Sequence, residues 1–383
     1  MTLTLSPQSS IESDPFTPYK RELMPGVFSY SAGFPSYPAQ FARDVITAGI
    51  LAGNSELLKS GLVTGALYQA GKTDPLTGAE PGKIAHETPG ATLPERWGQT
   101  DYNACDTSAL FLLASEGMST LNPDGFARIF NELIPNINQA IEYIFRHIED
   151  DIFVERPPEQ APGFCLKVTM WKDSILPEPG KEEPIYPVVY PNAHFINARG
   201  MLSASRILND PELSVLSDRM YKRGIAEFIR QDGYVVYRDG EKELTQPSSD
   251  ELHNLAYIPK TYGGLLPFTA ISTRATQLET PFGYMCTPRE IADELLDAYH
   301  ADKVWTQDNG LILYGASKFG LTREAAVAAS ILPHIGQGQE YFSVEADGCG
   351  RLKPLGEGND RQLWAVAAKH SIEHQVLINN PWL

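Results

Sequence analysis

Residues Pro38–Gly53 read PAQFARDVITAGILAG, with apolar side chains recurring at three- and four-residue steps. This spacing collects the apolar groups on one face of a helix and predicts an amphipathic helix. Asn54–Gln69 continues the same spacing after a short break. The stretch therefore predicts two consecutive helices, and the pattern recurs along most of the chain.

The same periodicity predicts further helices. They span Thr107–Gly117, Gly125–Glu149, Ala193–Leu208, Asp210–Arg230, Pro288–His300, Trp305–Phe319, Thr322–Leu332 and Arg361–His374. Two of them have recognisable starts, because Asn122-Pro123 and Thr287-Pro288 each place a capping residue before a proline. Strand signals are few and short: Tyr234–Tyr237, and Ile185–Tyr190, which Pro187 interrupts.

Long segments rich in glycine and proline separate the helices. They are Gly71–Thr100, Glu155–Pro191, Gln246–Pro267 and Gly336–Gly358. Loops longer than about 12–15 residues are uncommon in compact domains and often carry function. Dividing 383 residues by twelve gives about 32 for each helix and its loop. The chain therefore suits an all-α toroid of paired helices, with the long loops forming a rim.

Charge and composition exclude several classes of protein. The 31 basic and 48 acidic residues give a net charge of −17, with a pI near 4.9. This balance argues against a nucleic-acid partner and against docking on an anionic membrane, whereas a neutral sugar meets no such penalty. There is no run of about 18 apolar residues and no signal-peptide pattern at the start. The four cysteines are scattered, so we expect free thiols and a cytoplasmic protein.

Compact catalytic signatures are absent from the sequence. There is no GxSxG, no phosphate-binding GxxxxGK[ST] and no HExxH, and His86-Glu87 lacks the second histidine of a zinc helix. The eight histidines show no metal-ligand spacing. We therefore expect neither a metal nor an organic cofactor.

Aromatic residues stand beside carboxylates in several of the segments between and at the ends of helices. Those segments contain Arg43-Asp44, Pro81–Glu87, Tyr102 with Asp106, Trp171–Ser174, Trp305 with Asp308, and Glu340–Phe342. In a carbohydrate site an aromatic face covers the apolar face of a sugar, carboxylates bind its hydroxyls, and two carboxyls perform acid and base chemistry. The alternative is that these acids are solvated surface charges and the tryptophans belong to the core.

Seven segments carry a more specific pattern. They are Gly33-Phe34-Pro35 with Phe41–Asp44, PGKIAHE at Pro81–Glu87, DYNACDTSALF at Asp101–Phe111, WKDS at Trp171–Ser174, VWTQDN at Val304–Asn309, Glu340–Phe342, and Gln362–Ala365. Together they resemble the catalytic domain of glycogen-debranching amylo-α-1,6-glucosidases, within the six-hairpin glycosidase superfamily. The resemblance spans Gly33 to about His370 and implies a single (α/α)6 catalytic domain over residues 26–383, after a polar lead-in at 1–25.

The resemblance also implies roles for individual residues. Asp173 corresponds to the general acid and Glu340 to the general base of an inverting hydrolysis. The remaining matches imply sugar contacts by Arg43, Asp44, His86, Glu87, Tyr102, Asp106, Trp171, Lys172, Trp305, Asp308 and Trp364. Met170 replaces a glycine of the family pattern and Gln339 a proline. Glu345, five residues beyond Glu340, is a rival for the base.

The sequence thus predicts a glycoside hydrolase for an α-glucosidic or related α-glycosidic bond, with a carbohydrate substrate. There is no room for the N-terminal β-sandwich domain that such enzymes commonly carry, so a small α-glucoside or a glycosyl-glycerate stands beside a glycogen branch as substrate. Two alternatives remain. A sugar epimerase on the same toroid would depend on His86 and His194, and a catalytically silent sugar-binding protein would keep the pocket without hydrolysis. No motif indicates the oligomeric state.

Overall fold

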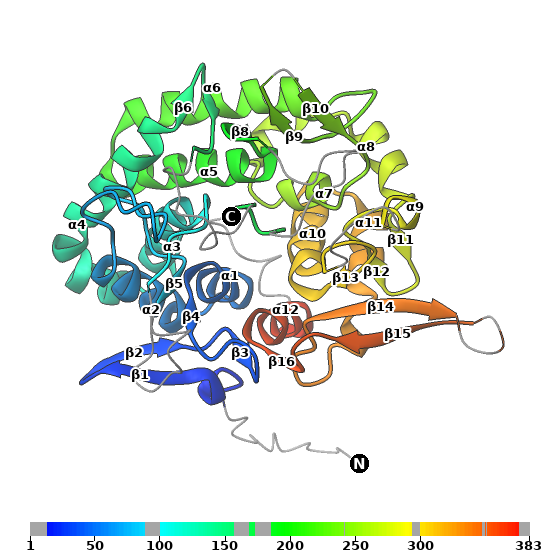
Figure 1. Ribbon diagram of the computed structural model, residues 1–383, viewed down its shortest axis with the longest axis horizontal. Helices are drawn as coiled ribbons and strands as arrows, with labels where there is room; N and C mark the ends of the chain where they lie inside the picture. The colour runs from blue at the N-terminus through cyan, green and yellow to red at the C-terminus, as the bar shows by residue number, and fades with distance from the viewer. Residues whose placement is uncertain are drawn as a thin grey trace, which may run out of the picture.

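The computed structural model describes residues 14–88, 100–156, 168–172, 185–240, 242–292, 299–346, 349 and 351–374. It is rich in helices, which are arranged around a central region with short strands toward the outside (Figure 1). The α-helices are α1 (Ala42–Ala52), α2 (Ser55–Leu67), α3 (Thr107–Leu121), α4 (Pro123–Arg146), α5 (Pro191–Leu208), α6 (Pro211–Phe228), α7 (Asp250–Asn254), α8 (Phe268–Ala275), α9 (Arg289–Ala292), α10 (Thr306–Phe319), α11 (Thr322–Ala329) and α12 (Leu363–His374).

The helices pack in two layers. Helix α1 contacts α3, α3 contacts α5, α5 contacts α7, α7 contacts α10, and α10 contacts α12, which packs against α1 (Figure 1). A second helix packs on most members of this series: α2 on α1, α4 on α3, α6 on α5, α8 on α7 and α11 on α10. The first series is therefore surrounded by protein on several sides.

Burial follows from this arrangement. Every residue of α1 is buried, as are the first twelve of α3, Thr107–Met118. Helix α4 instead buries one stripe, which includes Leu133, Ile137, Ala140, Ile141 and Ile144, and exposes its other face to solvent. A helix enclosed by neighbours can be apolar all round, whereas an outer helix needs only one apolar face.

Side-chain caps fix where several helices begin. The Asn54 side chain accepts hydrogen bonds from the backbone N–H groups of Glu56 and Leu57 at the start of α2. The Asn122 side chain accepts one from Gly125 ahead of α4, whose first residue is Pro123. Such caps satisfy N–H groups that have no partner within the helix. The helix start predicted at Asn122-Pro123 is confirmed.

The strands are short and form small, separate sheets. They are β1 (Lys20–Met24), β2 (Val27–Tyr30), β3 (Gly33–Phe34), β4 (Gln40–Phe41), β5 (Glu87–Thr88), β6 (Ile148–Glu149), β7 (Ile152–Phe153), β8 (Val188–Val189), β9 (Val235–Asp239), β10 (Lys242–Thr245), β11 (Glu279–Thr280), β12 (Gly283–Tyr284), β13 (Val304–Trp305), β14 (Tyr341–Ala346), β15 (Leu352–Glu357) and β16 (Arg361–Gln362). Pairing of β4 with β5 and of β16 with β3 joins segments that are far apart in the sequence.

Two predicted segments differ from the structure. Of the helix predicted over Pro288–His300, only Arg289–Ala292 is helical among the described residues, and 293–298 lie outside them. The loop predicted over Gly336–Gly358 contains the antiparallel pair of β14 and β15, which projects from the helices in Figure 1. The two strands are held together by hydrogen bonds between their backbones. Such bonds do not depend on the side chains, so the sequence pattern did not reveal the strands.

Two further predictions omitted regular structure. The loop predicted over Gln246–Pro267 contains α7, a short helix against α10. Within the predicted lead-in, β1 pairs with β2, which lies just beyond residue 25, and the side chains of Phe16 and Tyr19 are buried in the main core. Burial of these two aromatic rings attaches the described part of the lead-in to the helices.

Candidate functional site

Glu340 lies just before β14 and is anchored through its backbone. Its N–H donates to the Asn359 carbonyl, and its carbonyl accepts from both the N–H and the hydroxyl of Thr306 at the start of α10. The carboxylate is 1% exposed. The Tyr299 hydroxyl donates to Oε1 at 2.8 Å, and the Asn359 backbone N–H donates to Oε2 at 2.7 Å. Glu340 is thus a buried carboxylate held in one orientation.

The turn that precedes Asn359 leaves space for this carboxylate. Gly358 has a φ of +70°, and a Cβ added there would collide with the Glu340 carboxylate and lie 2.6 Å from the Tyr341 ring. Glycine adopts positive φ without the cost that a side chain brings. The Gln339 side chain donates to the carbonyls of Glu357 and Asn359, so it ties the same turn to the strand. This contact accounts for a glutamine where the family pattern has proline.

Arg43 and Asp44 occupy the buried first turn of α1. The Arg43 guanidinium donates to Asp106 at 2.8 Å and to the Thr169 carbonyl at 3.1 Å. Asp44 accepts from the side chain of Gln362 at 3.0 Å. Both residues are 5–6% exposed. For Arg43-Asp44 the alternative of solvated surface charge is therefore wrong, because both side chains are buried and hydrogen-bonded.

A hydrogen-bonded chain links Asp44 to Glu340. Gln362 donates to Asp44, and the oxygen of its amide accepts from the Asn359 side chain at 2.9 Å. Asn359 then donates through its backbone to Glu340. The Asn359 side-chain oxygen accepts from the Ser36 N–H, which fixes the asparagine itself. The two carboxylates are thus held in a defined relation by residues of β16 and of the turn before it.

Aromatic rings form the wall of the same pocket. The Trp305 ring stacks between His300, at 4.5 Å between centroids, and Tyr341, at 4.8 Å. Both of its faces are therefore covered, and it has no exposed surface. Trp171 and Trp364 lie edge-on to Trp305 and keep 4% and 8% exposure. We therefore expect Trp171 and Trp364, the two rings that pack edge-on against Trp305, to make the sugar contact predicted for Trp305.

Trp364, which lines the pocket, carries a polar group without a described partner. Its indole N–H is buried and has no hydrogen-bond partner within the described part of the chain. A buried donor without a partner carries a cost of about 1–3 kcal/mol. A ligand oxygen in the pocket could remove this cost by accepting the hydrogen bond.

Trp171 and Lys172 are fixed by an aspartate that the sequence did not single out. The Trp171 indole donates to Asp250 Oδ1 at 2.7 Å, and Lys172 Nζ lies 3.2 Å from Asp250 Oδ2. Lys172 also donates to the Ser248 hydroxyl and to the Cys286 carbonyl. Burial lowers the pKa of Lys172, but the charges of Asp250, Cys286 and Asp308 and the hydrogen bond to Asp250 together raise it by more, so the pKa lies above its ordinary value. The buried ammonium stays charged.

His86 lines the pocket just before β5, and Glu87 in β5 lies outside the described lining. His86 packs edge-on against Phe41 and lies 3.8 Å from the Asp101 carboxylate. Burial raises the pKa of Asp101, but His86 and the hydrogen bonds from Asn103 together lower it by more. Burial, followed by repulsion from Asp101, raises the pKa of Glu87 to about 8. One Glu87 oxygen is buried without a described partner. Glu87 is therefore protonated at neutral pH and can donate a hydrogen bond.

One pocket collects seven of the residues predicted from the sequence. Its described lining is Tyr37, Phe41, Arg43, Asp44, His86, Trp171, Tyr299, His300, Trp305, Glu340, Gln362 and Trp364. Burial lowers the pKa of His300 well below its ordinary value, with further lowering by Lys172 and Arg43, so His300 is neutral. The pocket thus combines aromatic rings, one buried base candidate and hydrogen-bonding groups.

Other predicted residues lie outside this lining. Asp106 is the partner of Arg43, and Lys172 is the partner of Asp250. The Tyr102 hydroxyl donates to the Tyr68 carbonyl at 2.6 Å. Asp308 accepts from His253 at 2.8 Å in the interior.

The two remaining acids differ in what the structure says of them. Glu345 is exposed on β14, opposite Lys353, and does not line the pocket. Asp173 lies outside the described residues. Its role as general acid stays a prediction.

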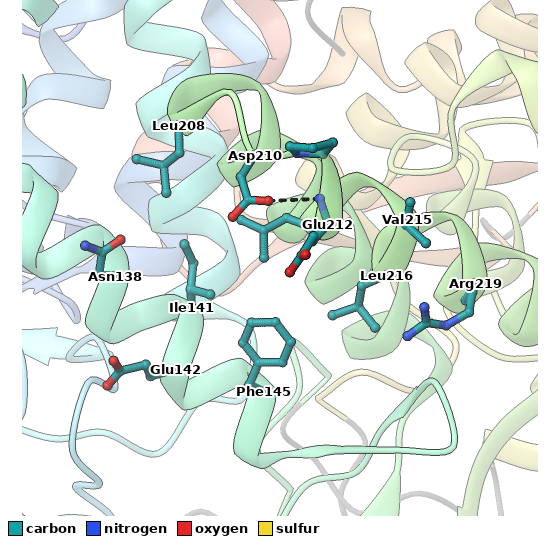
Figure 2. Close-up of a pocket in the computed structure, with 12 residues that line it drawn as sticks. Asn138, Ile141, Glu142, Phe145, Leu208, Asp210, Glu212, Val215, Leu216 and Arg219 are labelled. Atoms are coloured by element: carbon teal, nitrogen blue, oxygen red, sulfur yellow. Dashed lines mark hydrogen bonds between the residues drawn. The ribbon is translucent and has the colours of Figure 1, made fainter.

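A second hollow lies between α4 and α6. Figure 2 shows Ile141 and Phe145 of α4 facing Leu216 of α6 across it. None of the predicted site residues lines this hollow. Among the described residues, no group of three or more His, Cys, Asp or Glu side chains could hold a metal ion. Within the same residues, no helix has the length and apolar character needed to cross a membrane.

Comparison with known proteins adds evidence on the fold. No family model matches the sequence, and no curated protein does. Among solved structures, a GH63 mannosylglycerate hydrolase from Thermus thermophilus in complex with glucose is 15% identical, with a TM-score of 0.64 over 95% of this chain and 97% of that chain. In its complex with Tris and D-glycerate the TM-score is 0.62, at 13% identity, over 94% and 98%. The chain has a glycosidase-like fold.

A second glycosidase extends this likeness. A rhamnosidase from Klebsiella oxytoca with rhamnose bound is 13% identical, with a TM-score of 0.53 over 91% of this chain and 60% of that chain. At such identities the likeness concerns the fold alone. The neighbours agree with the six-hairpin glycosidase resemblance at the level of architecture and leave the debranching specificity as a prediction.

Proposed function

We propose that this protein is a glycoside hydrolase that cleaves an α-glycosidic bond with inversion of configuration. The observation that carries the proposal is the Glu340 carboxylate, which is buried in an aromatic pocket and held by hydrogen-bond donors on both oxygens. General bases in glycoside hydrolysis need this kind of fixed, ionised carboxylate. The glycosidase-like fold supports the proposal.

The proposed architecture is an (α/α)6 toroid. Helices α1, α3, α5, α7, α10 and α12 would form its inner layer, and α2, α4, α6, α8 and α11 the outer layer. Support comes from the order of their contacts, in which α12 packs back against α1. The pocket residues lie at helix starts and in the segments between helices, on the side where such a toroid would carry its rim.

In the proposed mechanism, Glu340 takes a proton from the water that attacks the anomeric carbon, and Asp173 protonates the departing oxygen. Inversion requires about 6.5–9.5 Å between the two carboxyls, so that the water fits between the base and the sugar. A general acid needs a raised pKa, which the apolar Trp171 beside it would favour. A positive charge lowers the pKa of a neighbouring carboxyl group. Asp250 compensates the charge of Lys172, so this charge would lower the pKa of a neighbouring general acid less.

Sugar recognition would come from the groups around Glu340. Asp44, oriented by Gln362, would accept hydrogen bonds from hydroxyls of the bound ring. The indole N–H of Trp364 would donate to a sugar oxygen, and the part of Trp171 that lines the pocket would pack on the apolar face of the sugar. Arg43 would act mainly by holding Asp106 and the Thr169 carbonyl in place.

The substrate we favour is a small α-glycoside. Mannosylglycerate hydrolase, a neighbour over nearly its whole length, supports glycosyl-glycerates as one class. The resemblance to debranching enzymes supports an α-1,6-glucosidic bond as another. The choice of Glu340 over Glu345 as the base has support as well. The base must lie in the pocket that holds the sugar, and Glu340 lines this pocket whereas Glu345 is exposed outside it.

The test is hydrolysis of a panel by the purified full-length chain, followed by proton NMR. The panel contains α-linked disaccharides, glycosyl-glycerates and limit dextrin. Release of a sugar with inverted configuration would support the class, and Asp173→Asn and Glu340→Gln should each abolish it. Glu345→Gln is the matched control and should retain activity. No release by folded protein across the panel would contradict the proposal.

The epimerase alternative was expected to depend on His86 and His194, and the contacts of His194 argue against a catalytic role for it. His194 accepts from the Phe153 N–H at 3.1 Å and donates to the Met220 carbonyl at 2.9 Å. Both ring nitrogens are occupied, and burial lowers the pKa of His194 to about 4. His194 is therefore a structural residue between α5 and α6. Incubation with free reducing sugars in the same NMR assay would detect epimerisation if hydrolysis is absent.

A further inference from the structure

The hydroxyl of Tyr299 contacts both Glu340 and Tyr37. It donates to Glu340 Oε1 at 2.8 Å and lies 3.2 Å from the Tyr37 hydroxyl. The Tyr299 ring packs edge-on against Trp305 at 4.9 Å and Tyr341 at 5.4 Å between centroids. Its carbonyl accepts the Trp305 indole N–H at 3.3 Å. Tyr299 is therefore a hydroxyl donor whose position is fixed by neighbouring rings.

We infer that Tyr299 is a positioning residue for Glu340: its hydroxyl orients the carboxylate and stabilises the ionised form that accepts a proton from water. Tyr37 holds the Tyr299 hydroxyl in turn. This inference rests on the proposed function, because it concerns the base of that reaction. It assigns a role to a residue that none of the sequence motifs includes.

The physical argument concerns the charge on Glu340. A hydrogen bond to the ionised form of a carboxyl lowers its pKa, and burial raises it. Glu340 is 1% exposed, so without donors it would tend to be protonated and unable to act as a base. Each carboxylate oxygen has more than one acceptor position, so the Tyr299 bond leaves room for the attacking water.

Tyr299 remains a donor over the working pH range. Burial raises the pKa of its hydroxyl, and the Glu340 charge, the contact with Tyr37 and the hydrogen bonds raise it further. The phenol therefore keeps its proton at any pH at which the protein would be assayed. The second described donor to Glu340, the Asn359 N–H, belongs to the backbone and cannot be removed by a side-chain change.

Other charged and titratable groups also face the Glu340 pocket. Those in its described lining are Tyr37, Arg43, Asp44, His86, Tyr299 and His300. Arg43 is bound to Asp106, and Asp44 is bound to Gln362. Asp360 and Arg361, next to Asn359, are exposed. Replacing Tyr299 with phenylalanine changes none of these groups and removes only a hydroxyl.

The experiment compares Tyr299→Phe with a matched control, Tyr262→Phe, using the substrate that the wild-type protein hydrolyses fastest. The Tyr262 hydroxyl also donates to a carboxylate, Asp218 at 3.0 Å, but neither residue belongs to the described pocket lining. Loss of one hydrogen bond to a charged group should lower kcat for Tyr299→Phe roughly ten- to a hundredfold, with KM changed less than about threefold. The Glu340 pKa should rise, so the acidic limb of the pH profile of kcat/KM should move up by about one pH unit. Tyr262→Phe removes a phenol hydrogen bond away from Glu340 and should change kcat less than about threefold.

A second variant covers the case in which Tyr299→Phe does not fold. Incorporation of 3,5-difluorotyrosine at position 299 keeps the ring and strengthens the donor, so the acidic limb should move to lower pH. Wild-type kcat and an unmoved limb in these variants would overturn the inference and leave the proposed function intact. A rise in KM alone would assign Tyr299 to substrate contact and also overturn it. Wild-type protein that hydrolyses no glycoside would overturn the proposed function and this inference together.

Discussion

Replacing Asp250 with asparagine should destabilise the protein by about 3 kcal/mol. Asp250 and Lys172 are each 1% exposed, and their carboxylate and ammonium lie 3.2 Å apart. Removing one partner of a buried ion pair costs about 3–5 kcal/mol, because the other charge stays buried. The asparagine oxygen can still accept from Trp171, which places the expected loss at the lower end of that range.

The second half of this test removes the other charge. In the double variant Asp250→Asn/Lys172→Met no unpaired charge remains, so its loss should be smaller than the sum of the two single losses by about 2 kcal/mol. The measurement is urea-induced unfolding followed by circular dichroism and by tryptophan fluorescence. The two probes should give the same transition, and the dependence of the unfolding free energy on urea (the m value) should be the same in all variants. Asp151→Asn is the control, because the Asp151–Arg219 pair is largely exposed and should contribute less than about 1 kcal/mol.

Two results would refute this reasoning. If Asp250→Asn changes the unfolding free energy by less than about 1 kcal/mol, the ion pair does not have the buried character that the structure gives it. If the single and double losses are additive, Lys172 and Asp250 are not coupled.

Three further predictions concern the pocket. Gly358→Ala should abolish hydrolysis, measured by the NMR assay, because its Cβ would displace the Glu340 carboxylate and positive φ is unfavourable for alanine; wild-type activity would show that the turn can relax. Trp364→Phe removes the indole N–H but keeps a ring, so kcat/KM should fall roughly tenfold, and an unchanged value would mean that no ligand atom meets that donor. The Glu87 pKa is raised to about 8, so the native state binds this proton more tightly than the unfolded state, and stability should decline as pH rises from about 4.5 to 8. Glu87→Gln should decline less in melting temperature over that range, and parallel curves would contradict the raised pKa.

The helices that form the scaffold could be predicted well from the sequence. The observed α1 lies within the predicted Pro38–Gly53, α6 within the predicted Asp210–Arg230, and α12 within the predicted Arg361–His374. Their ends were missed by a few residues. At Gln40–Phe41 the chain pairs with β5 before the helix begins, and such pairing depends on a segment about 45 residues away.

Pocket-lining residues could be predicted when they lie within a recognisable motif, but not when they only hold another pocket residue in place. Arg43, Trp171, Glu340 and Trp364 each lie in a recognisable segment and line the pocket. Tyr299 has no such signal, since it lies near the end of a predicted helix and nothing local marks it as a partner of Glu340. A tyrosine a few residues from a tryptophan-containing segment is common in cores, so the sequence alone offered no reason to choose it.

By itself, the sequence determined most of the long helices and the chemical groups at their starts, because side-chain periodicity and caps act over a few residues, but it did not reveal the short helices α7 and α8. Tertiary structure decided which of those groups meet. It paired Arg43 with Asp106 and left Asp44 to Gln362, 318 positions away. It also buried Glu340 and exposed Glu345, although only five residues separate them, because β14 leaves the pocket between the two. Contacts of this range depend on how the helices pack, and that information is distributed over the whole chain.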